Sequence, residues 1–277
     1  MELDPFAQIA DEEPADGSAA RTVLLGSAKR GFCPLRKEFV QRARAHKSRP
    51  SVLGAMVNAR EELALRALLL IHALEPILPD NDLPLGTWAR MLAADRRPCS
   101  PSQASAAFNR LVARGLIDRT DVGRRVLIAP RMETGSGEPF VRSTAKGASV
   151  GPGYLTIPHE FWTTGLADRL RLPGTAMFLV ALHETTQDPA YQVSLKQMQE
   201  WYGISERTAE RGYLELSKGN LLLTHTQSKK SVKSPTGLQT VTWRALDGPY
   251  STAARAALQT RTKAAVSSVA SNAAGRS

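Results

Sequence analysis

Amide, hydroxyl and guanidinium side chains gather on one side of a helix that we expect to begin after Ser100. Ala104, Phe108 and Leu111 form its apolar stripe, which faces the protein interior. The outward side, with Gln103 at its edge, carries the candidate site residues Ser102, Gln103, Ser105, Asn109 and Arg110. In a DNA major groove an amide pairs bidentately with adenine and an arginine with guanine. The two amides and the arginine are therefore the predicted base readers.

A turn with three arginines follows this helix. Gly123 is placed to form the tight turn of a β-hairpin, and Arg119, Arg124 and Arg125 lie in its strands and beside its tip. The planar, permanently charged guanidinium suits a phosphate or a narrow minor groove. We expect these three arginines to contact the DNA backbone.

The same pattern recurs about 105 residues later, after Ser205. Its apolar stripe, Ala209, Tyr213 and Leu216, keeps the offsets of the first copy. The outward side, with Thr208 at its edge, is mixed in charge: Glu206, Arg207, Thr208, Glu210, Arg211 and Leu214. The glutamates repel phosphate unless one accepts from a cytosine amino group; alternatively they pair with the arginines along the helix, which needs no DNA. We expect the two arginines to add sequence specificity.

A long, polar and positive loop is predicted at residues 227–237, between strands at residues 221–226 and 238–243. It contains Lys229, Lys230 and Lys233. An ammonium group is a compact point charge, so we expect these lysines to add affinity through phosphates rather than to read bases.

The elements that would position these side chains also occur twice. A short helix with Leu85, Trp88, Met91 and Leu92 precedes the first copy, and the spacing of its apolar residues returns at Leu195, Met198, Trp201 and Tyr202. An apolar helix precedes each short helix, one rich in leucine near residues 63–74 and one at residues 172–187. The predicted fold class is therefore α+β, mainly α with small β-hairpins, in two domains.

The N-terminal boundaries follow from charge and capping patterns. Residues 1–20 are expected to be a disordered acidic N-terminus. Residues 21–57, with nine basic side chains against one acidic, are interpreted as a basic arm that either lies on DNA or packs on the first domain. The first domain is predicted at residues 58–129, where Asn58 and Glu61 would form a capping box.

The C-terminal boundaries follow from glycine content and apolar periodicity. Residues 130–153 are Gly-rich and are predicted to be a flexible linker, the alternative being a segment ordered by packing. The second domain is predicted at residues 154–246. The remaining residues, 247–277, are an Ala/Ser-rich basic tail that we expect to be disordered in isolation, or helical on a partner.

Composition favours a polyanionic partner. The chain has 277 residues and a formal net charge of +10, although residues 1–16 carry six acids and no Lys or Arg. The remainder is therefore near +16. Cys33 and Cys99 provide neither a disulfide framework nor a four-cysteine zinc site. We expect no membrane partner and a cytoplasmic, nucleoid-associated location, because the sequence has no long apolar run and no signal peptide.

The histidines and glycines do not form a catalytic motif. The five histidines match no zinc-binding pattern, and no phosphate-binding loop is present. We therefore predict that the protein is not an enzyme, with no catalytic residues, no metal, no cofactor and no small-molecule ligand.

Residues 58–128 and 154–245 both resemble winged helix-turn-helix modules. The segment Ile204–Thr208 is similar to the turn and helix start of bacterial regulators, and the tandem arrangement resembles two-winged-helix plasmid replication initiators. The resemblance implies sequence-specific binding of double-stranded DNA by a bacterial transcriptional regulator. The alternatives are a plasmid replication initiator that binds origin repeats, and a winged-helix interaction subunit of a chromosome-organising complex. A homodimer is left open.

Overall fold

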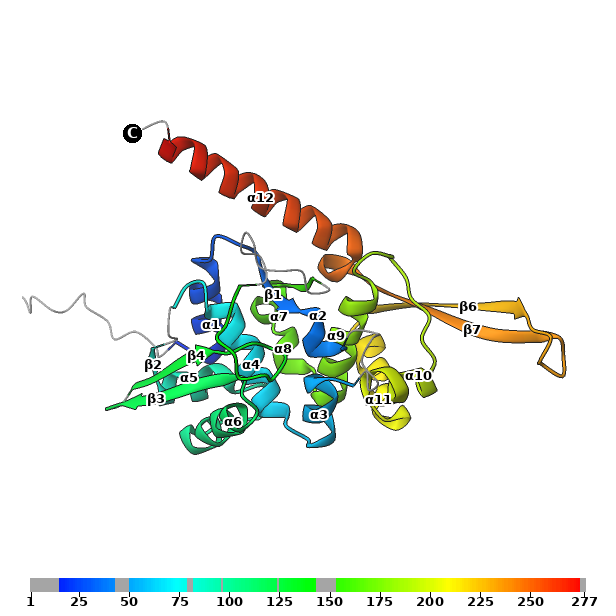
Figure 1. The fold of residues 1–277 in the computed structure, drawn as a ribbon, viewed down its shortest axis with the longest axis horizontal. Coiled ribbons are helices and arrows are strands. Elements are labelled where there is room, and N and C mark those ends of the chain that lie inside the picture. The colour runs from blue at the N-terminus through cyan, green and yellow to red at the C-terminus, as the bar shows by residue number, and fades with distance from the viewer. Residues whose placement is uncertain are drawn as a thin grey trace, which may run out of the picture.

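The two halves of the chain repeat one order of elements in the computed structural model, which describes residues 15–42, 50–78, 82–95, 97–123, 125–142 and 153–274 (Figure 1). The first half contains β1 (Phe32–Arg36), α2 (Lys37–Val40), α3 (Val52–Asn58), α4 (Glu62–Leu74), β2 (Leu83–Pro84), α5 (Leu85–Leu92), α6 (Pro101–Ala113), β3 (Ile117–Val122) and β4 (Arg125–Pro130). The second contains β5 (Tyr154–Pro158), α7 (Glu160–Thr163), α8 (Leu166–Arg169), α9 (Leu172–Glu184), α10 (Leu195–Tyr202), α11 (Glu206–Lys218), β6 (Leu222–Lys230) and β7 (Leu238–Leu246). Helix α1 (Gly17–Gly26) precedes both halves, and a 3-10 turn (Gly248–Tyr250) and α12 (Thr252–Ala274) follow them. The predicted α+β class with small antiparallel sheets is confirmed.

The repeat extends to helix lengths and strand order. Helices α4, α5 and α6 have 13, 8 and 13 residues, and α9, α10 and α11 have the same three lengths. In the first half β4 lies between β2 and β3. In the second half Tyr191 forms a bridge with Arg244 of β7, so a residue just before the short helix again pairs with the last strand. Each half therefore has the same chain path.

A strand pair joins the two halves. β1 and β5 are antiparallel, with Phe32 opposite Pro158, Pro34 opposite Thr156 and Arg36 opposite Tyr154. Each strand leads directly, or within one residue, into a four-residue helix of its own half. An antiparallel pair reverses one strand relative to the other. The pair itself therefore has an approximate local two-fold axis, which passes near Pro34 and Thr156 at the junction of the halves.

The segment interpreted as a basic arm is part of the protein body. Its described residues form most of α1, then β1, α2 and α3, and Leu35, Phe39 and Leu53 are fully buried. The interpretation as an extended arm on DNA is wrong for these residues, because their apolar side chains fill the core. The arm also contacts both halves, not only the first. Arg44, Lys47 and Arg49 lie outside the described residues.

The start of the first domain differs from the prediction. Asn58 ends α3 and does not cap α4, which begins at Glu62 without a side-chain cap. Arg60 has a φ of 56°, so the chain turns between the two helices. The Asn58 amide donates to the carbonyl oxygen of Gly203 at 3.1 Å, in the second half. The amide therefore stabilises a contact between halves rather than a helix end.

The predicted linker, residues 130–153, is packed over its described residues 130–142. Arg131 forms a β-bridge with Pro139, and Glu133 is fully buried in a salt bridge with Arg36 at 3.2 Å. Arg142 pairs with Glu75 at 2.9 Å. Flexibility is thus the wrong prediction here, and order imposed by packing is the correct alternative. Residues 143–152 lie outside the described residues.

Both terminal segments contain more helix than predicted. Helix α1 begins at Gly17, within the segment expected to be disordered, and Asp16 Oδ1 accepts from the Ala19 amide at 2.6 Å. Residues 1–14 lie outside the described residues. In the tail, α12 is anchored by Arg255, which is 4% exposed and donates to the carbonyl oxygens of Tyr250 at 2.8 Å and Thr185 at 2.7 Å. The hydrogen bonds of this buried guanidinium hold the start of α12 against the protein, although the helix has only a few apolar residues to pack there.

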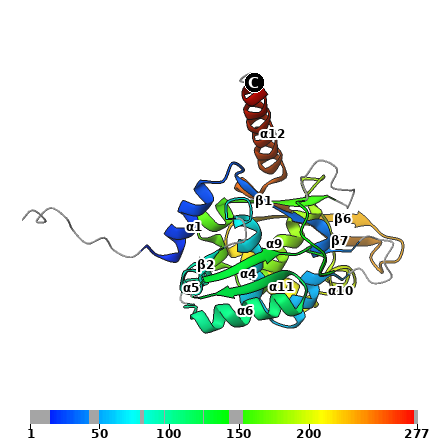
Figure 2. The same ribbon diagram turned by 60° about the vertical axis from the view of Figure 1, so that its left-hand side comes forward.

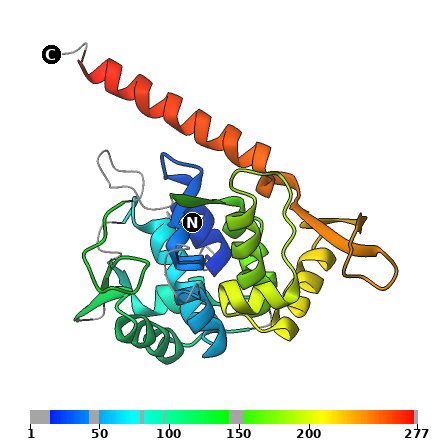
Figure 3. The same cartoon turned by 45° about the vertical axis from the view of Figure 1, so that its right-hand side comes forward.

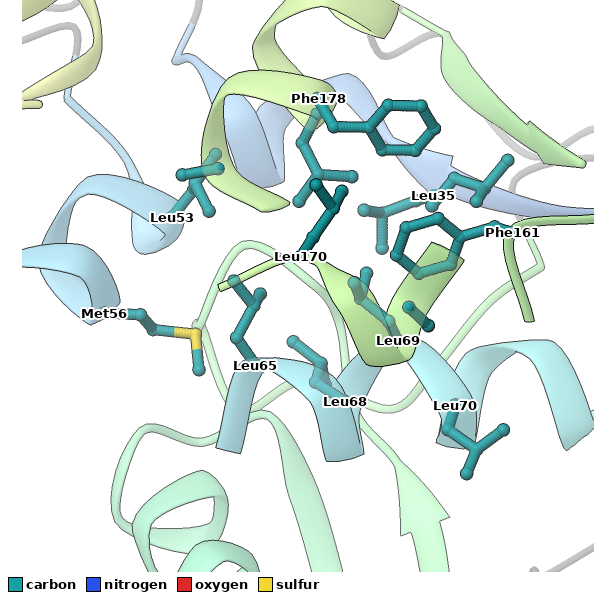
Figure 4. Packing of buried hydrophobic residues seen from close by; sticks show 14 of the residues in the cluster. Leu35, Leu53, Met56, Leu65, Leu68, Leu69, Leu70, Phe161, Leu170 and Phe178 are labelled. Atoms are coloured by element: carbon teal, nitrogen blue, oxygen red, sulfur yellow. The ribbon is translucent and has the colours of Figure 1, made fainter. Parts of the chain in front are cut away.

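One continuous core spans both halves. Helices α4 and α9 are apolar on nearly every side and lie at its centre. Figure 4 shows part of this packing, with side chains from both halves facing one another: Leu35, Leu53, Met56, Leu65, Leu68, Leu69, Phe161, Leu170 and Phe178. Burying each such side chain contributes roughly 1.5–3 kcal/mol, so separating the halves would expose a large apolar surface.

Charged side chains reinforce this junction. Arg21 of α1, only 2% exposed, forms a salt bridge with Asp168 of α8. Arg97 pairs with Glu62 and donates to the main-chain carbonyl of Asp168. Glu62 also accepts from the Leu172 amide at 3.3 Å. The halves are therefore held in one orientation, which contradicts the prediction of two domains joined by a flexible linker.

His159, which follows β5 at this junction, gives the fold a pH dependence. Burial lowers the pKa of this side chain from 6.5 to about 4, and the Leu25 carbonyl partly opposes the shift. Below pH 6.5 the unfolded chain therefore binds a proton that the folded chain excludes, until pH falls to about 4. We expect the free energy of unfolding to fall by about 3 kcal/mol across this window on account of His159. Urea titrations at several pH values check this.

The matched variants are His159→Gln and His225→Gln. His225 lies on exposed β6, so its replacement should leave the pH profile unchanged, whereas His159→Gln should flatten it. Some slope will remain, because burial also lowers the pKa of His72. An equal slope in His159→Gln and the parent protein would contradict the assignment.

Candidate nucleic-acid interface

Helix α6 begins as the sequence predicts, and its cap engages a predicted base reader. Ser100 Oγ accepts from the Gln103 amide nitrogen at 3.2 Å, and the Gln103 side-chain oxygen accepts from the Ser100 amide at 2.8 Å. This reciprocal capping box stabilises the first turn. It also uses the oxygen that a bidentate adenine contact would need, so Gln103 presents only its amide N–H donors in this arrangement.

The outward face of α6 is open to solvent. Ala104, Phe108 and Leu111 are fully buried, and Trp88 of α5 meets Phe108 edge to face at 5.4 Å. The exposed side chains are Ser102, Gln103, Ala106, Asn109 and Arg110, whereas Ser105 is half-buried. The predicted division of this helix into an inner and an outer side is confirmed.

Arg119 takes a different position from the predicted phosphate contact. Its guanidinium lies against α6 and donates to Ser105 Oγ at 2.8 Å and to Asn109 Oδ1 at 2.9 Å. Asp121 neutralises it at 3.0 Å, and the arginine side chain is 12% exposed. The structure thus brings three predicted site residues together, but Arg119 faces the protein.

The first hairpin turns where predicted. Gly123 has a φ of 60° between β3 and β4, a conformation that glycine adopts without strain. Arg125 is 62% exposed and pairs with Asp82 at 3.0 Å. An exposed ion pair of this kind is worth little, so Arg125 can exchange Asp82 for a phosphate. Arg124 lies outside the described residues.

Helix α11 also presents the predicted side. Ser205 Oγ accepts from the Thr208 amide at 3.3 Å, and the Thr208 side chain is half-buried. Gly212 faces α9, where a Cβ would overlap the Pro173 carbonyl oxygen, so close packing fixes how α11 is turned. The exposed side chains on the other side are Glu206, Arg207, Glu210, Arg211 and Leu214. Within the described chain, none of these four charged residues forms an ion pair, so the alternative of pairing along the helix is not realised.

The second hairpin is longer than predicted. Strands β6 and β7 have nine residues each, and Lys229 and Lys230 lie in β6 opposite Gln239 and Leu238, not in a loop. The prediction failed because polar side chains on both faces of an exposed ribbon give no alternating apolar pattern. Only Lys233 of the three lysines lies in the turn.

Trp243 in β7 was not among the predicted site residues. Lys229 Nζ lies 4.8 Å from the centre of its ring, and the indole N–H donates to the Gln227 side chain at 3.0 Å. These cross-strand contacts rigidify the ribbon that carries the lysines. The signal in the sequence was a tryptophan between polar residues in a strand.

The two helices lie on the same side of the molecule. Figure 1 and Figure 3 show α6 and α11 on the side opposite α12, with the β3–β4 and β6–β7 hairpins projecting at opposite ends. Figure 2 shows the same relation of α6 to α12 from another direction. We call the outward faces of α6 and α11 together with the two hairpins the helix–hairpin surface. It collects every described site residue that the sequence predicted.

Comparison of the chain with protein-family models, curated proteins and solved structures finds no match. Across the residues that the structure describes, no helix is long and apolar enough to cross a membrane. Within the same residues, no group of three or more His, Cys, Asp and Glu side chains is placed to hold a metal ion.

Proposed function

We propose that the protein binds specific sequences in double-stranded DNA through two winged helices. The observation that carries this proposal is the recurrence, in both halves, of a core helix, a short strand or bridge, two helices and a hairpin whose last strand pairs with the first. This chain path supports the assignment of each half as a winged helix, in which the helix before the hairpin would enter the major groove. In both halves that helix turns an exposed polar face to solvent.

The arrangement of the halves constrains how they would dock. Because α6 and α11 lie on one side of a rigid body, we propose that they enter successive major grooves, about 34–36 Å apart along one face of the duplex. The approximate two-fold axis through the β1–β5 pair implies two half-sites in inverted orientation. One chain would then recognise a site that otherwise requires a homodimer.

The process is proposed as transcriptional regulation, with replication initiation at origin repeats as the alternative. The presence of two DNA-binding halves in one rigid chain favours replication initiation, because such a chain would occupy each origin repeat as a monomer. The DNA around the encoding gene distinguishes the two processes. A single binding site at a promoter supports a transcriptional regulator, and an array of direct repeats supports a replication initiator.

The testing experiment is selection of bound sequences from a random duplex library with the full chain, followed by affinity measurements at two salt concentrations. We expect a two-part site with one fixed spacing and a steep dependence on salt. Inserting base pairs between the half-sites should weaken binding, because the halves cannot move apart. No enrichment, or binding indifferent to salt, would contradict the proposal and favour a protein-interaction module.

The lysines of the second hairpin should supply affinity without specificity. We expect the triple substitution of Lys229, Lys230 and Lys233 by alanine to weaken binding to all duplexes alike. Each lost phosphate contact reduces the slope of log K against log salt by about 0.9, so the slope should fall by up to about 2.7. Fluorescence anisotropy over a salt series measures it.

A matched control removes the same charge elsewhere. Lys29, Arg261 and Lys263 are exposed; the last two lie on α12, and Lys29 is two residues from Gly31, which lies beside Leu258 of α12. Their triple alanine variant has the same net charge as the lysine variant. Equal slopes in the two variants would mean that net charge, and not the second hairpin, determines the salt dependence.

A further inference from the structure

The donors of Arg119 are directed into the protein. Nε and Nη2 donate to the two carboxylate oxygens of Asp121 at 3.0 and 3.2 Å. Nη1 donates to Ser105 Oγ at 2.8 Å, to the Ser105 carbonyl at 3.2 Å and to Asn109 Oδ1 at 2.9 Å. Asp121 therefore orients the guanidinium in β3, and the guanidinium in turn contacts α6. Little of this arginine remains for a phosphate.

This contact determines which way the Asn109 amide faces. A guanidinium has donors only, so it can face the amide oxygen but not the amide NH2 group. The oxygen of Asn109 is thus turned toward Arg119, and its two N–H donors are left for a ligand at the exposed face of α6. The side chain is oriented before DNA arrives, which reduces the entropy lost on binding.

We infer that Arg119 is a positioning residue that makes Asn109 a donor-only reader. A bidentate adenine contact needs the amide oxygen and nitrogen on the same base edge, whereas guanine offers the acceptors O6 and N7 and thymine offers O4. Adenine offers a single acceptor, N7, beside its N6 amino donor, so a donor-only Asn109 favours guanine or thymine over adenine. The inference rests on the proposed function and replaces both the adenine contact expected of Asn109 and the phosphate contact expected of Arg119.

The first test compares Arg119→Met with the parent protein in sequence selection. Methionine keeps an apolar stem but has no donor, so the Asn109 amide can rotate. The base pair that Asn109 contacts is the position of the selected site at which Asn109→Ala loses selectivity. At that position the parent should enrich guanine or thymine, whereas Arg119→Met should also accept adenine. Affinity for the cognate site should fall roughly 5- to 150-fold in Asn109→Ala. Adding Arg119→Met to Asn109→Ala should cost little more.

Salt provides a second readout that a phosphate contact would change. The salt slope of Arg119→Met should equal that of the parent, because the guanidinium contacts protein. Arg125→Met is the matched control, since Arg125 is exposed in the same hairpin, and its slope should fall by about 0.9. A slope reduced equally in both variants would overturn the positioning role.

A measurement without DNA separates this inference from the proposed function. The side-chain NH2 group of Asn109 should be rigid by NMR relaxation in the parent and mobile in Arg119→Met, while that of Asn58, which donates to Gly203, is unchanged. Equal mobility of Asn109 in both proteins overturns the inference whether or not DNA binds. If Asn109 is rigid and the selected base opposite it is adenine, the inference is wrong but the proposed function stands. If the parent protein selects no sequence, the proposed function is contradicted, and so is the role of Asn109 as a base reader.

Discussion

Asp168→Ala lowers the free energy of unfolding by about 3–5 kcal/mol, because it leaves a buried arginine without its counter-ion. Arg21 is 2% exposed and the Asp168 side chain 16% exposed, so the pair is largely shielded from water. The pair joins α1 to α8 across the junction, next to the contacts that Arg97 makes there. The loss should therefore affect both halves in a single transition, as measured by circular dichroism in urea.

The pKa of Asp168 explains why the pair is costly to break without being strongly stabilising. Burial raises this pKa, and the attraction of Arg21, Arg66 and Arg97 offsets the rise only in part. The folded state thus keeps the proton to a higher pH than the unfolded state, so this carboxyl lowers stability as pH rises through that interval. A variant that lacks the charges of both Arg21 and Asp168 leaves no buried charge without a partner.

Two comparisons make this prediction specific. The double variant Arg21→Met, Asp168→Leu should be more stable than Asp168→Ala, because it leaves no buried charge unpaired. Asp188→Ala, at an exposed position, should change stability by less than about 0.5 kcal/mol. A loss below about 1 kcal/mol in Asp168→Ala, or separate transitions for the two halves, would contradict the rigid junction.

The sequence predicts those parts of the fold whose signals are local. The serine caps of α6 and α11 and the turn at Gly123 each involve residues a few positions apart, and all are present. The exposed sides of α6 and α11 follow from their apolar stripes alone. Local periodicity thus located the outward residues of the candidate site.

The parts that it missed depend on partners far away in the chain. Strand β1 pairs with a strand 122 residues later, and no local pattern distinguishes a buried Leu35 within a basic stretch from one in a solvated arm. The role of Arg119 has the same origin, because a spacing of ten residues does not reveal that its guanidinium reaches Asn109. The count of basic residues predicted that the segment around Leu35 and the side chain of Arg119 contact DNA, whereas in the structure both pack against the protein.

Arg207→Ala combined with Arg211→Ala should abolish recognition of the second half-site. The two arginines are exposed one helical turn apart on α11, about 6 Å along its axis, so under the proposed function they would reach bases about two steps apart. A bidentate arginine–guanine contact is worth about 1–3 kcal/mol of discrimination. We expect the double variant to bind the selected site roughly 30- to 10⁴-fold more weakly, with a far smaller loss on random duplex.

Two glutamates next to these arginines, Glu206 and Glu210, affect how the result is interpreted. Glu206 and Glu210 form no ion pair with them within the described chain, so each arginine keeps its donors for DNA and each glutamate remains a charge that repels phosphate. Glu210→Gln should therefore strengthen binding to random duplex, and it weakens the cognate site only if Glu210 accepts from a cytosine there. Arg261→Ala with Lys263→Ala is the control of equal charge and should leave specificity intact. If the arginine variant weakens all sequences alike, α11 contacts the backbone, and only the first half reads bases.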